Sequence, residues 1–245
     1  MSLAHSPKII TDGLVLCLDA GNAKSYPGSG TAWTDLSGNG NNGTLENGPI
    51  YNSSNGGSLV FDGSNDYVNS TSTNAIVGNN PTQISLESWF KTNSTLSSYI
   101  SSLKRLNTNS TLLSLTINQQ SSSPTVQNYL GFLYDVGDTG GDNGAGHKWI
   151  TTNENFYGKW THICAVVNQS GAFLYINGVL RNQNLTDSFY GSNRSNPSAN
   201  FTIGAFEASQ LWLNGSIPTV KIYNRALTAS EIQQNYNALR GRFGI

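Results

Sequence analysis

A short acidic turn offers the sharpest candidate site in the sequence. Asp62 and Asp66 flank a Gly-Ser-Asn segment, so that two carboxylates and the Asn65 amide are close together along the chain. Calcium prefers about six to eight oxygen ligands from carboxylates, amides and backbone carbonyls. Asp62, Asn65 and Asp66 are therefore a candidate Ca2+ site. In the alternative interpretation, these side chains accept hydrogen bonds from the backbone of a tight turn.

A second candidate site lies in the glycine-rich segment DVGDTGGDNGAGHKW. Its acidic side chains could bind calcium, and acidic groups beside an aromatic face also suit a polar, ring-shaped ligand such as a sugar. A solvated loop tip or a contact with a neighbouring subunit explains the same composition. The candidate ligand-binding residues are Asp135, Asp138, Asp142, His147 and Trp149.

The remaining aromatic candidates divide into surface and core. Trp212, in the segment SQLWLNGS, is a candidate exposed platform for a ligand, and burial in the core is the alternative. Trp89 and Trp160 lie in regular strand patterns, so we expect both in the core. His162 follows Trp160 in the same pattern and is interpreted as structural.

No catalytic motif is found. The five glutamates never occur in the Glu-x-Asp-x-Glu spacing, and the sequence holds neither a G-x-S-x-G nor a G-x-x-x-x-G-K motif. The three histidines and two cysteines form no zinc pattern. We therefore predict a protein that is not an enzyme. Glycoside hydrolysis is the least favoured function, retained because two carboxyls distant in sequence can meet in space.

Composition excludes further classes of protein. Only 11% of the residues are charged and the net charge is −1, without a basic run, which excludes a nucleic-acid partner. No apolar stretch approaches about 18 residues, so we expect no membrane insertion. The first residues lack a secretory signal, which predicts synthesis in a cytoplasm. Cys17 and Cys164 lie in apolar runs and are predicted to be free buried thiols, with a disulfide as the alternative.

Short alternating segments predict an all-β domain. Their spacing of about 10 residues favours a sandwich or a barrel. Asn177-Gly178 is a strong two-residue turn signal between two of the strands. Residues 21–49 and 135–148 are predicted to be long loops. The predicted strands cover residues 13–20, 58–68, 85–91, 99–103, 112–118, 129–134, 160–168, 172–176, 201–205 and 217–223, with a short one from Val179.

One helix is predicted near the C-terminus. Thr228 and Glu231 have the spacing of a capping box, which satisfies exposed amides at the start of a helix. Gly241 is a natural stop signal. We expect the helix to pack as a plug against the edge of the sandwich. Its predicted apolar face comprises Ile232, Tyr236 and Leu239.

Seven segments occur in the order found in a known family: DLSGNGNNGTL, SLVFDGSNDYV, ISLESWFK, KWTHICAVV, LYINGVL, FTIGA and KIYNRALTASEI. Together they resemble the laminin-G-like, pentraxin-like branch of the concanavalin A-like lectin/glucanase superfamily. This resemblance implies a two-sheet antiparallel jelly-roll sandwich with one short C-terminal helix. The sequence has no internal repeat and no convincing linker, so we expect one domain, residues 11–245, behind an N-terminal arm of residues 1–10.

The sequence departs from the family at one place. Related chains carry an acidic pair just before the strand ending in IYNRAL, where this chain has Pro218 and Thr219. If those acids help to hold calcium in the relatives, that half of the site is missing here.

The opening segment, residues 12–45, is similar to structural proteins of marine tailed phages. This similarity implies a non-catalytic protein of the virion surface, either a capsid decoration or an adsorption-fibre component that binds host glycans. The implied partners are shell or fibre proteins, host cell-surface polysaccharide and further copies of the chain in a homo-oligomer. A calcium-dependent, carbohydrate-binding lectin module is the alternative, by analogy with the common use of the fold.

Overall fold

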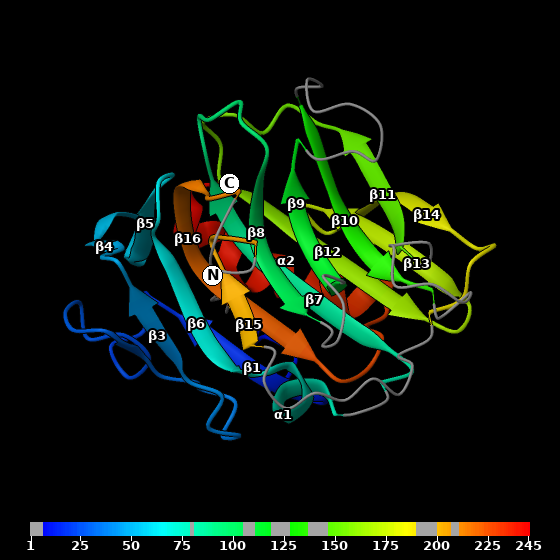
Figure 1. Cartoon of the computed structure of the whole chain (residues 1–245), viewed down its shortest axis with the longest axis horizontal. Coiled ribbons are helices and arrows are strands. Elements are labelled where there is room, and N and C mark those ends of the chain that lie inside the picture. The colour runs from blue at the N-terminus through cyan, green and yellow to red at the C-terminus, as the bar shows by residue number, and fades with distance from the viewer. Residues whose placement is uncertain are drawn as a thin grey trace, which may run out of the picture.

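The computed structural model describes residues 7–78, 81–104, 111–118, 128–136, 147–189, 200–206 and 211–245. Within these ranges the chain folds into two eight-stranded antiparallel sheets, with one longer helix outside them (Figure 1). The predicted fold, an all-β sandwich with a C-terminal helix, is confirmed. None of the helices in these ranges is both long and apolar enough to cross a membrane.

The first sheet, sheet A, contains β1 (Leu14–Asp19), β4 (Ile50–Asn52), β5 (Ser58–Asp62), β7 (Ile84–Lys91), β12 (Thr161–Asn168), β13 (Gly171–Ile176), β14 (Val179–Asn184) and β16 (Asn214–Tyr223). Its strand order is β14-β13-β12-β7-β16-β5-β4. The long strand β16 pairs with β5 through its first half and with β1 through its second half. It therefore joins the two ends of the chain in one sheet.

The second sheet, sheet B, contains β2 (Ala32–Trp33), β3 (Gly43–Glu46), β6 (Tyr67–Ser72), β8 (Ser98–Lys104), β9 (Thr111–Ile117), β10 (Tyr129–Asp135), β11 (His147–Asn153) and β15 (Asn200–Ile203). Its strand order is β11-β10-β9-β8-β15-β6-β3-β2. The helices are α1 (Thr73–Val77), α2 (Ala229–Leu239) and the 3-10 turns η1 (Ser54–Gly56) and η2 (Arg240–Phe243).

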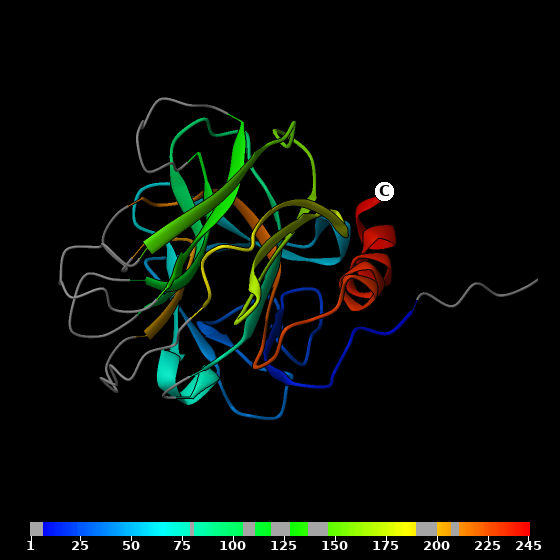
Figure 2. The same cartoon turned by 90° about the vertical axis from the view of Figure 1, so that its right-hand side faces the viewer.

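Side-chain alternation builds the core between the sheets. In β7, Leu86 and Phe90 belong to this core, whereas Glu87 and Trp89 point to the outer face of sheet A. Glu87 and Trp89 are nevertheless buried, because α2 covers that outer face (Figure 2). We expected the helix at an edge of the sandwich, and this was wrong. The helix packs on the face of the sheet, over an apolar cluster of Cys164, Val166, Tyr175, Tyr223, Leu227 and Ile232.

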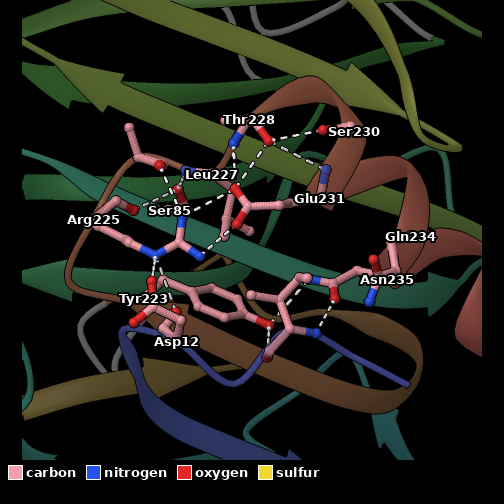
Figure 3. Close-up of polar contacts among 12 residues, drawn as sticks. Asp12, Ser85, Tyr223, Arg225, Leu227, Thr228, Ser230, Glu231, Gln234 and Asn235 are labelled. Carbon is pink, nitrogen blue, oxygen red and sulfur yellow. Dashed lines mark hydrogen bonds and ion pairs between the residues drawn. The ribbon is translucent and has the colours of Figure 1, made fainter. Parts of the chain in front are cut away.

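The start of α2 is fixed by the predicted capping box (Figure 3). Thr228 Oγ1 accepts a hydrogen bond from the Glu231 backbone N–H at 3.3 Å, and the Thr228 N–H donates to Glu231 Oε2 at 2.8 Å. Arg225 donates to the same carboxylate at 2.6 Å and forms an ion pair with Asp12 at 2.9 Å. The hydrogen bond from Arg225 lowers the pKa of Glu231 to about 2.

The end of α2 differs from the prediction. The helix passes directly into η2, so Gly241 lies inside a 3-10 turn and does not end the helical segment. The left-handed residue that ends this segment is Gly244, with φ of 73°. The extra turn places Phe243 between two tryptophan rings, with centroid distances of 4.4 Å to Trp89 and 4.9 Å to Trp160.

A buried polar network lies between sheet A and α2. Lys221 Nζ and Glu87 Oε1 are 2.7 Å apart, and Asn235 Nδ2 donates to Glu87 Oε2 at 2.9 Å. Burial raises the pKa of Glu87, but Lys221 and His162 outweigh it and hold that pKa well below its usual range. Asn235 also donates to the hydroxyl of Tyr223 at 3.0 Å. The network therefore ties the helix to two strands of the sheet.

The same helix holds the described part of the N-terminal segment. The Ile10 N–H donates to Asn235 Oδ1 at 2.8 Å, and Gln234 Nε2 donates to the Lys8 carbonyl at 2.8 Å. Residues 8–10 therefore lie against their own domain. Residues 1–6, the rest of the predicted arm, lie outside the described residues.

Cys17 and Cys164 are free and buried, as predicted. They lie in the same row across sheet A, because Cys17 pairs with Lys221, Lys221 with Glu87, and Glu87 with Cys164. Three strand spacings of about 4.8 Å each separate them, which is too far for a disulfide. Burial raises the pKa of the Cys17 thiol to about 11.

Candidate functional site

A cavity of about 360 Å3 opens on the outer face of sheet A, next to the end of η2. This size lies at the lower end of the range for small-molecule sites. We call it the Trp160 pocket, after its aromatic wall. Amide and hydroxyl side chains predominate among its lining residues, which are Asn52, Ser54, Asn55, Ser58, Val60, Lys91, Thr92, Asn93, Trp160, Asn214, Gly215 and Ser216.

Trp160 forms the aromatic wall. It immediately precedes β12 and is half-buried, so the prediction that it lies in the core was wrong. The ring of Phe243 packs against it, and its indole N–H donates to Asn55 Oδ1 at 3.3 Å. The ammonium group of Lys91 lies 5.8 Å from the ring centroid. The indole is thus held in one orientation at the rim of the pocket.

The adjoining wall is the turn η1 and the residues that follow it. Asn55 has a left-handed backbone, with φ of 53°, a conformation that asparagine tolerates better than most residues. Arg242 donates to the backbone carbonyl of Asn55 at 2.9 Å and to that of Gly57, and it forms an ion pair with Asp19 at 2.7 Å. Arg242 therefore fixes this wall to the C-terminal segment.

The floor comes from the ends of β7 and β16. Thr92 Oγ1 donates to the Asn214 carbonyl at 2.5 Å. Gly215 lies so close to β7 that an added Cβ would stand 2.6 Å from the Lys91 carbonyl oxygen. Only glycine fits there, and the two strand ends approach closely because of it.

The lining groups define what the pocket can do. An aromatic face stacks on the apolar side of a sugar ring, while amides and hydroxyls exchange hydrogen bonds with its hydroxyl groups. None of the twelve lining residues is acidic. Glycoside hydrolysis in the usual form requires two carboxyl groups about 5–10 Å apart, so the pocket suits binding and lacks the groups for cleavage.

The predicted calcium ligands lie in the turn between β5 and β6. Asp62 Oδ1 accepts hydrogen bonds from the N–H groups of Ser64 at 2.8 Å and Asn65 at 3.4 Å. Asp66 Oδ2 accepts from the Asp62 N–H at 3.1 Å, and burial raises the pKa of Asp66. These bonds satisfy the turn without a metal. The described residues also bring no three His, Cys, Asp or Glu side chains together in a metal-binding arrangement. Calcium at this turn stays a prediction.

Trp212 lies close to the same turn. It is half-buried, and its ring packs against that of Tyr67 with a centroid distance of 5.9 Å. Asn214, which lines the Trp160 pocket, donates from Nδ2 to the Asp62 carbonyl at 3.2 Å. The acidic turn is therefore joined to the rim of the pocket through Asn214.

The second candidate segment lies at the far edge of sheet B. Asp135 is fully buried at the end of β10, opposite His147 in the first position of β11. His147 and Trp149 are half-buried, and His147 Nε2 accepts a hydrogen bond from the Thr111 N–H at 3.2 Å. Asp138 and Asp142 lie outside the described residues. The first two residues of β11, His147 and Lys148, fall in the predicted loop of residues 135–148, and the rest of this strand was not predicted.

Comparisons with known proteins agree with this architecture. A sequence model of the concanavalin A-like lectin/glucanases superfamily matches residues 62–233. No curated protein matches the chain.

Solved structures match over nearly the whole chain. One is the binding domain of botulinum neurotoxin DC in complex with rat synaptotagmin II, with a TM-score of 0.68 at 18% identity, covering 94% of this chain and 52% of that one. Another is the binding domain of botulinum neurotoxin serotype G, with a TM-score of 0.64 at 17% identity, covering 91% and 50%. The chain spans about half the length of these structures, and the likeness concerns the fold.

Proposed function

Because the chain belongs to the concanavalin A-like lectin/glucanase superfamily, we propose that it is a non-catalytic carbohydrate-binding module whose binding site is the Trp160 pocket. The observation that carries this proposal is the combination of one oriented indole ring with amide and hydroxyl groups in a concave site. Such a site supplies both kinds of contact that a sugar ring offers. The lack of an acidic lining residue favours binding over hydrolysis.

Two further observations support a ligand at this place. The indole of Trp160 is held by Asn55 and Phe243, so that little side-chain entropy is lost when a ligand stacks on it. Two similar structures are a receptor-binding domain and the binding domain of botulinum neurotoxin DC in complex with SialylT. They are other proteins, at 20% and 17% identity, and they indicate that this fold serves in recognition modules.

The proposed setting of the module is the surface of a phage particle. This part of the proposal rests on the resemblance inferred from the sequence of residues 12–45 to structural proteins of marine tailed phages. In that setting the chain would decorate a shell or fibre, as a homo-oligomer, and hold the particle to polysaccharide on the host. Electron microscopy of phage particles labelled with an antibody to this chain tests the setting, because particles without label would contradict it.

A glycan array tests the binding function. The purified chain should bind a restricted set of glycans, and Trp160→Ala should weaken that binding at least about tenfold, because the stacking surface is lost. Trp149→Ala and Trp212→Ala are matched controls at the two other candidate surfaces, and both should bind as the unchanged protein does. Loss of binding in a control but not in Trp160→Ala would move the site to that surface. Absence of binding to every glycan would contradict the proposed function.

The same array, repeated in calcium and in EDTA, tests the metal. Calcium would be held by Asp62, Asn65 and Asp66, whose turn is joined to the pocket through Asn214. Binding that disappears in EDTA, and in the Asp62→Asn variant with calcium present, supports the calcium-dependent form of the module. Binding that survives EDTA contradicts it and leaves the pocket as a metal-free site.

A further inference from the structure

We infer that the ligand of the Trp160 pocket is an anionic sugar, a ring that carries a carboxylate or a sulfate ester, and that Lys91 binds its charge. This inference rests on the proposed carbohydrate-binding function and specifies the class of glycan.

Lys91 and Trp160 are neighbours across two strands. In the pairing of β7 with β12, Phe90 lies opposite Thr161, so the next residues outward along the two chains are Lys91 and Trp160. Lys91 also pairs with Ser216 of β16. Its side chain shares the outer face of sheet A with Trp89 and Glu87, because side chains alternate along a strand. The ammonium group and the indole are therefore presented to the same ligand.

The charge of Lys91 is not neutralised by a carboxylate within the described residues. Other cations are paired: Lys221 lies 2.7 Å from Glu87, and Arg242 lies 2.7 Å from Asp19. The contact found for Lys91 is the one with the ring of Trp160. Such a half-buried, unpaired ammonium group at the wall of a cavity is available to an anion.

The surroundings favour negative charge in the pocket. No lining residue is acidic, and Lys91 is the one cation among the twelve. Lys159, next to Trp160 in sequence, is exposed and adds a second positive charge near the rim. Asp19, which is not among the lining residues, is itself paired with Arg242. An anionic group that enters the pocket therefore meets attraction with little opposing charge.

A charged ligand also compensates Lys91 better than a neutral one does. A ligand stacked on Trp160 removes water from the neighbouring ammonium group, which costs free energy unless a new partner replaces it. A hydrogen bond between two charged groups is about twice as strong as one between neutral groups. A neutral sugar offers only hydroxyl groups, so the pocket as built favours an anionic ring over its neutral counterpart.

Isothermal titration with matched ligands tests the inference. We expect the unchanged protein to bind a uronic acid-containing oligosaccharide, or a sulfated one, at least about tenfold more tightly than the carboxyl-reduced or desulfated counterpart. Lys91→Gln should remove that difference, so that the charged ligand and its neutral counterpart bind about equally. Lys159→Gln, a neighbouring exposed lysine outside the pocket lining, is the matched control and should retain most of the preference. The carboxylate and sulfate pairs, measured separately, identify which anion is bound.

The outcomes separate this inference from the function on which it rests. Equal affinity for charged and neutral ligands, with binding that still depends on Trp160, overturns the anionic inference and leaves the carbohydrate site intact. A preference for the anion that survives Lys91→Gln also overturns it. Binding that is indifferent to Trp160→Ala overturns the site itself and the inference with it.

Discussion

At the scale of single residues, the half-buried position of Trp160 is set by a contact that is distant in sequence. Trp160 lies directly before β12 and, by alternation, on the same side of sheet A as His162 and Cys164. Those two residues lie under α2 and η2 on the outer face of the sheet. The alternation of side chains along the strand predicts the face on which Trp160 lies, and its indole ring indicates that it can stack on a ligand. The exposure depends on where the C-terminal segment stops covering the sheet. That boundary is set by Phe243, far away in sequence, and no local pattern contains it.

The buried pair of Glu87 and Lys221 carries a prediction about stability. Glu87→Gln leaves the Lys221 ammonium group buried without its counter-charge, which should lower the free energy of unfolding by about 3–5 kcal/mol. The double variant Glu87→Leu with Lys221→Met removes both charges and should recover most of that loss. Urea denaturation of the three proteins measures the effect. Equal destabilisation by the single and the double variant would contradict the role of the ion pair.

Acid should weaken the same pair. The pKa of Glu87 in the folded chain is held well below the ordinary value of 4.5, against the effect of burial, because Lys221 and His162 favour the carboxylate. The stabilisation is therefore complete above the ordinary carboxyl pKa and is lost as the pH falls below it. The free energy of unfolding should fall more steeply below about pH 4.5 in the unchanged protein than in the double variant.

At the scale of elements, α2 is the part of the structure that the sequence predicted in most detail. Thr228 and Glu231 form the predicted capping box, and Ile232 is buried as expected. The sequence did not reveal that the helix lies on a face of sheet A, because the strands beneath it have polar outward residues such as Glu87 and Lys221. Those residues are typical of a solvated face. Asn235, which joins Glu87 to the helix, is a polar residue, and the helical spacing of apolar residues does not predict its role.

The capping box gives a second pH-dependent prediction. Thr228→Ala removes the hydroxyl that accepts the Glu231 N–H and should lower the free energy of unfolding by about 1 kcal/mol. The pKa of Glu231 is lowered to about 2, mainly by its hydrogen bond from Arg225, so its stabilising effect is present above the ordinary value of 4.5 and is lost as the pH falls towards 2. Thermal unfolding followed between pH 2 and 7 checks both statements. Ser230→Ala serves as the control, since Ser230 contacts the Thr228 hydroxyl at 3.1 Å but accepts no backbone N–H from the described residues.

At the scale of the whole molecule, the long alternating strands were predictable and the short ones were not. The strands β7, β12 and β16 each supply several residues to the core, and their periodicity identified them. In the predicted loop of residues 21–49, β2 and β3 have only two and four residues, too few to establish an alternation. The strand β11 contributes one core residue, Ile150, and follows a glycine-rich stretch. Its local pattern therefore does not distinguish it from the end of a loop.

The position of the candidate site was likewise not predictable from local sequence patterns. Each of its residue types is visible in the sequence, but the pocket joins segments from β4 to β16 that only the sheet order brings together. The acidic turn at residues 62–66 is recognisable in the sequence because its groups are adjacent along the chain. Sites assembled from several strands have no such local signature, and here the aromatic wall, the loop wall and the floor come from different parts of the sequence.

The most direct measurement is an NMR titration of the 15N-labelled chain with the glycan that binds best. The five tryptophans give five indole N–H signals, one of which belongs to the pocket. The account predicts that the Trp160 signal shifts, together with the side-chain amides of Asn52, Asn55 and Asn214, while the Trp149 and Trp212 signals stay in place. A titration in which Trp149 or Trp212 shifts and Trp160 does not would contradict the assignment of the binding site to this pocket.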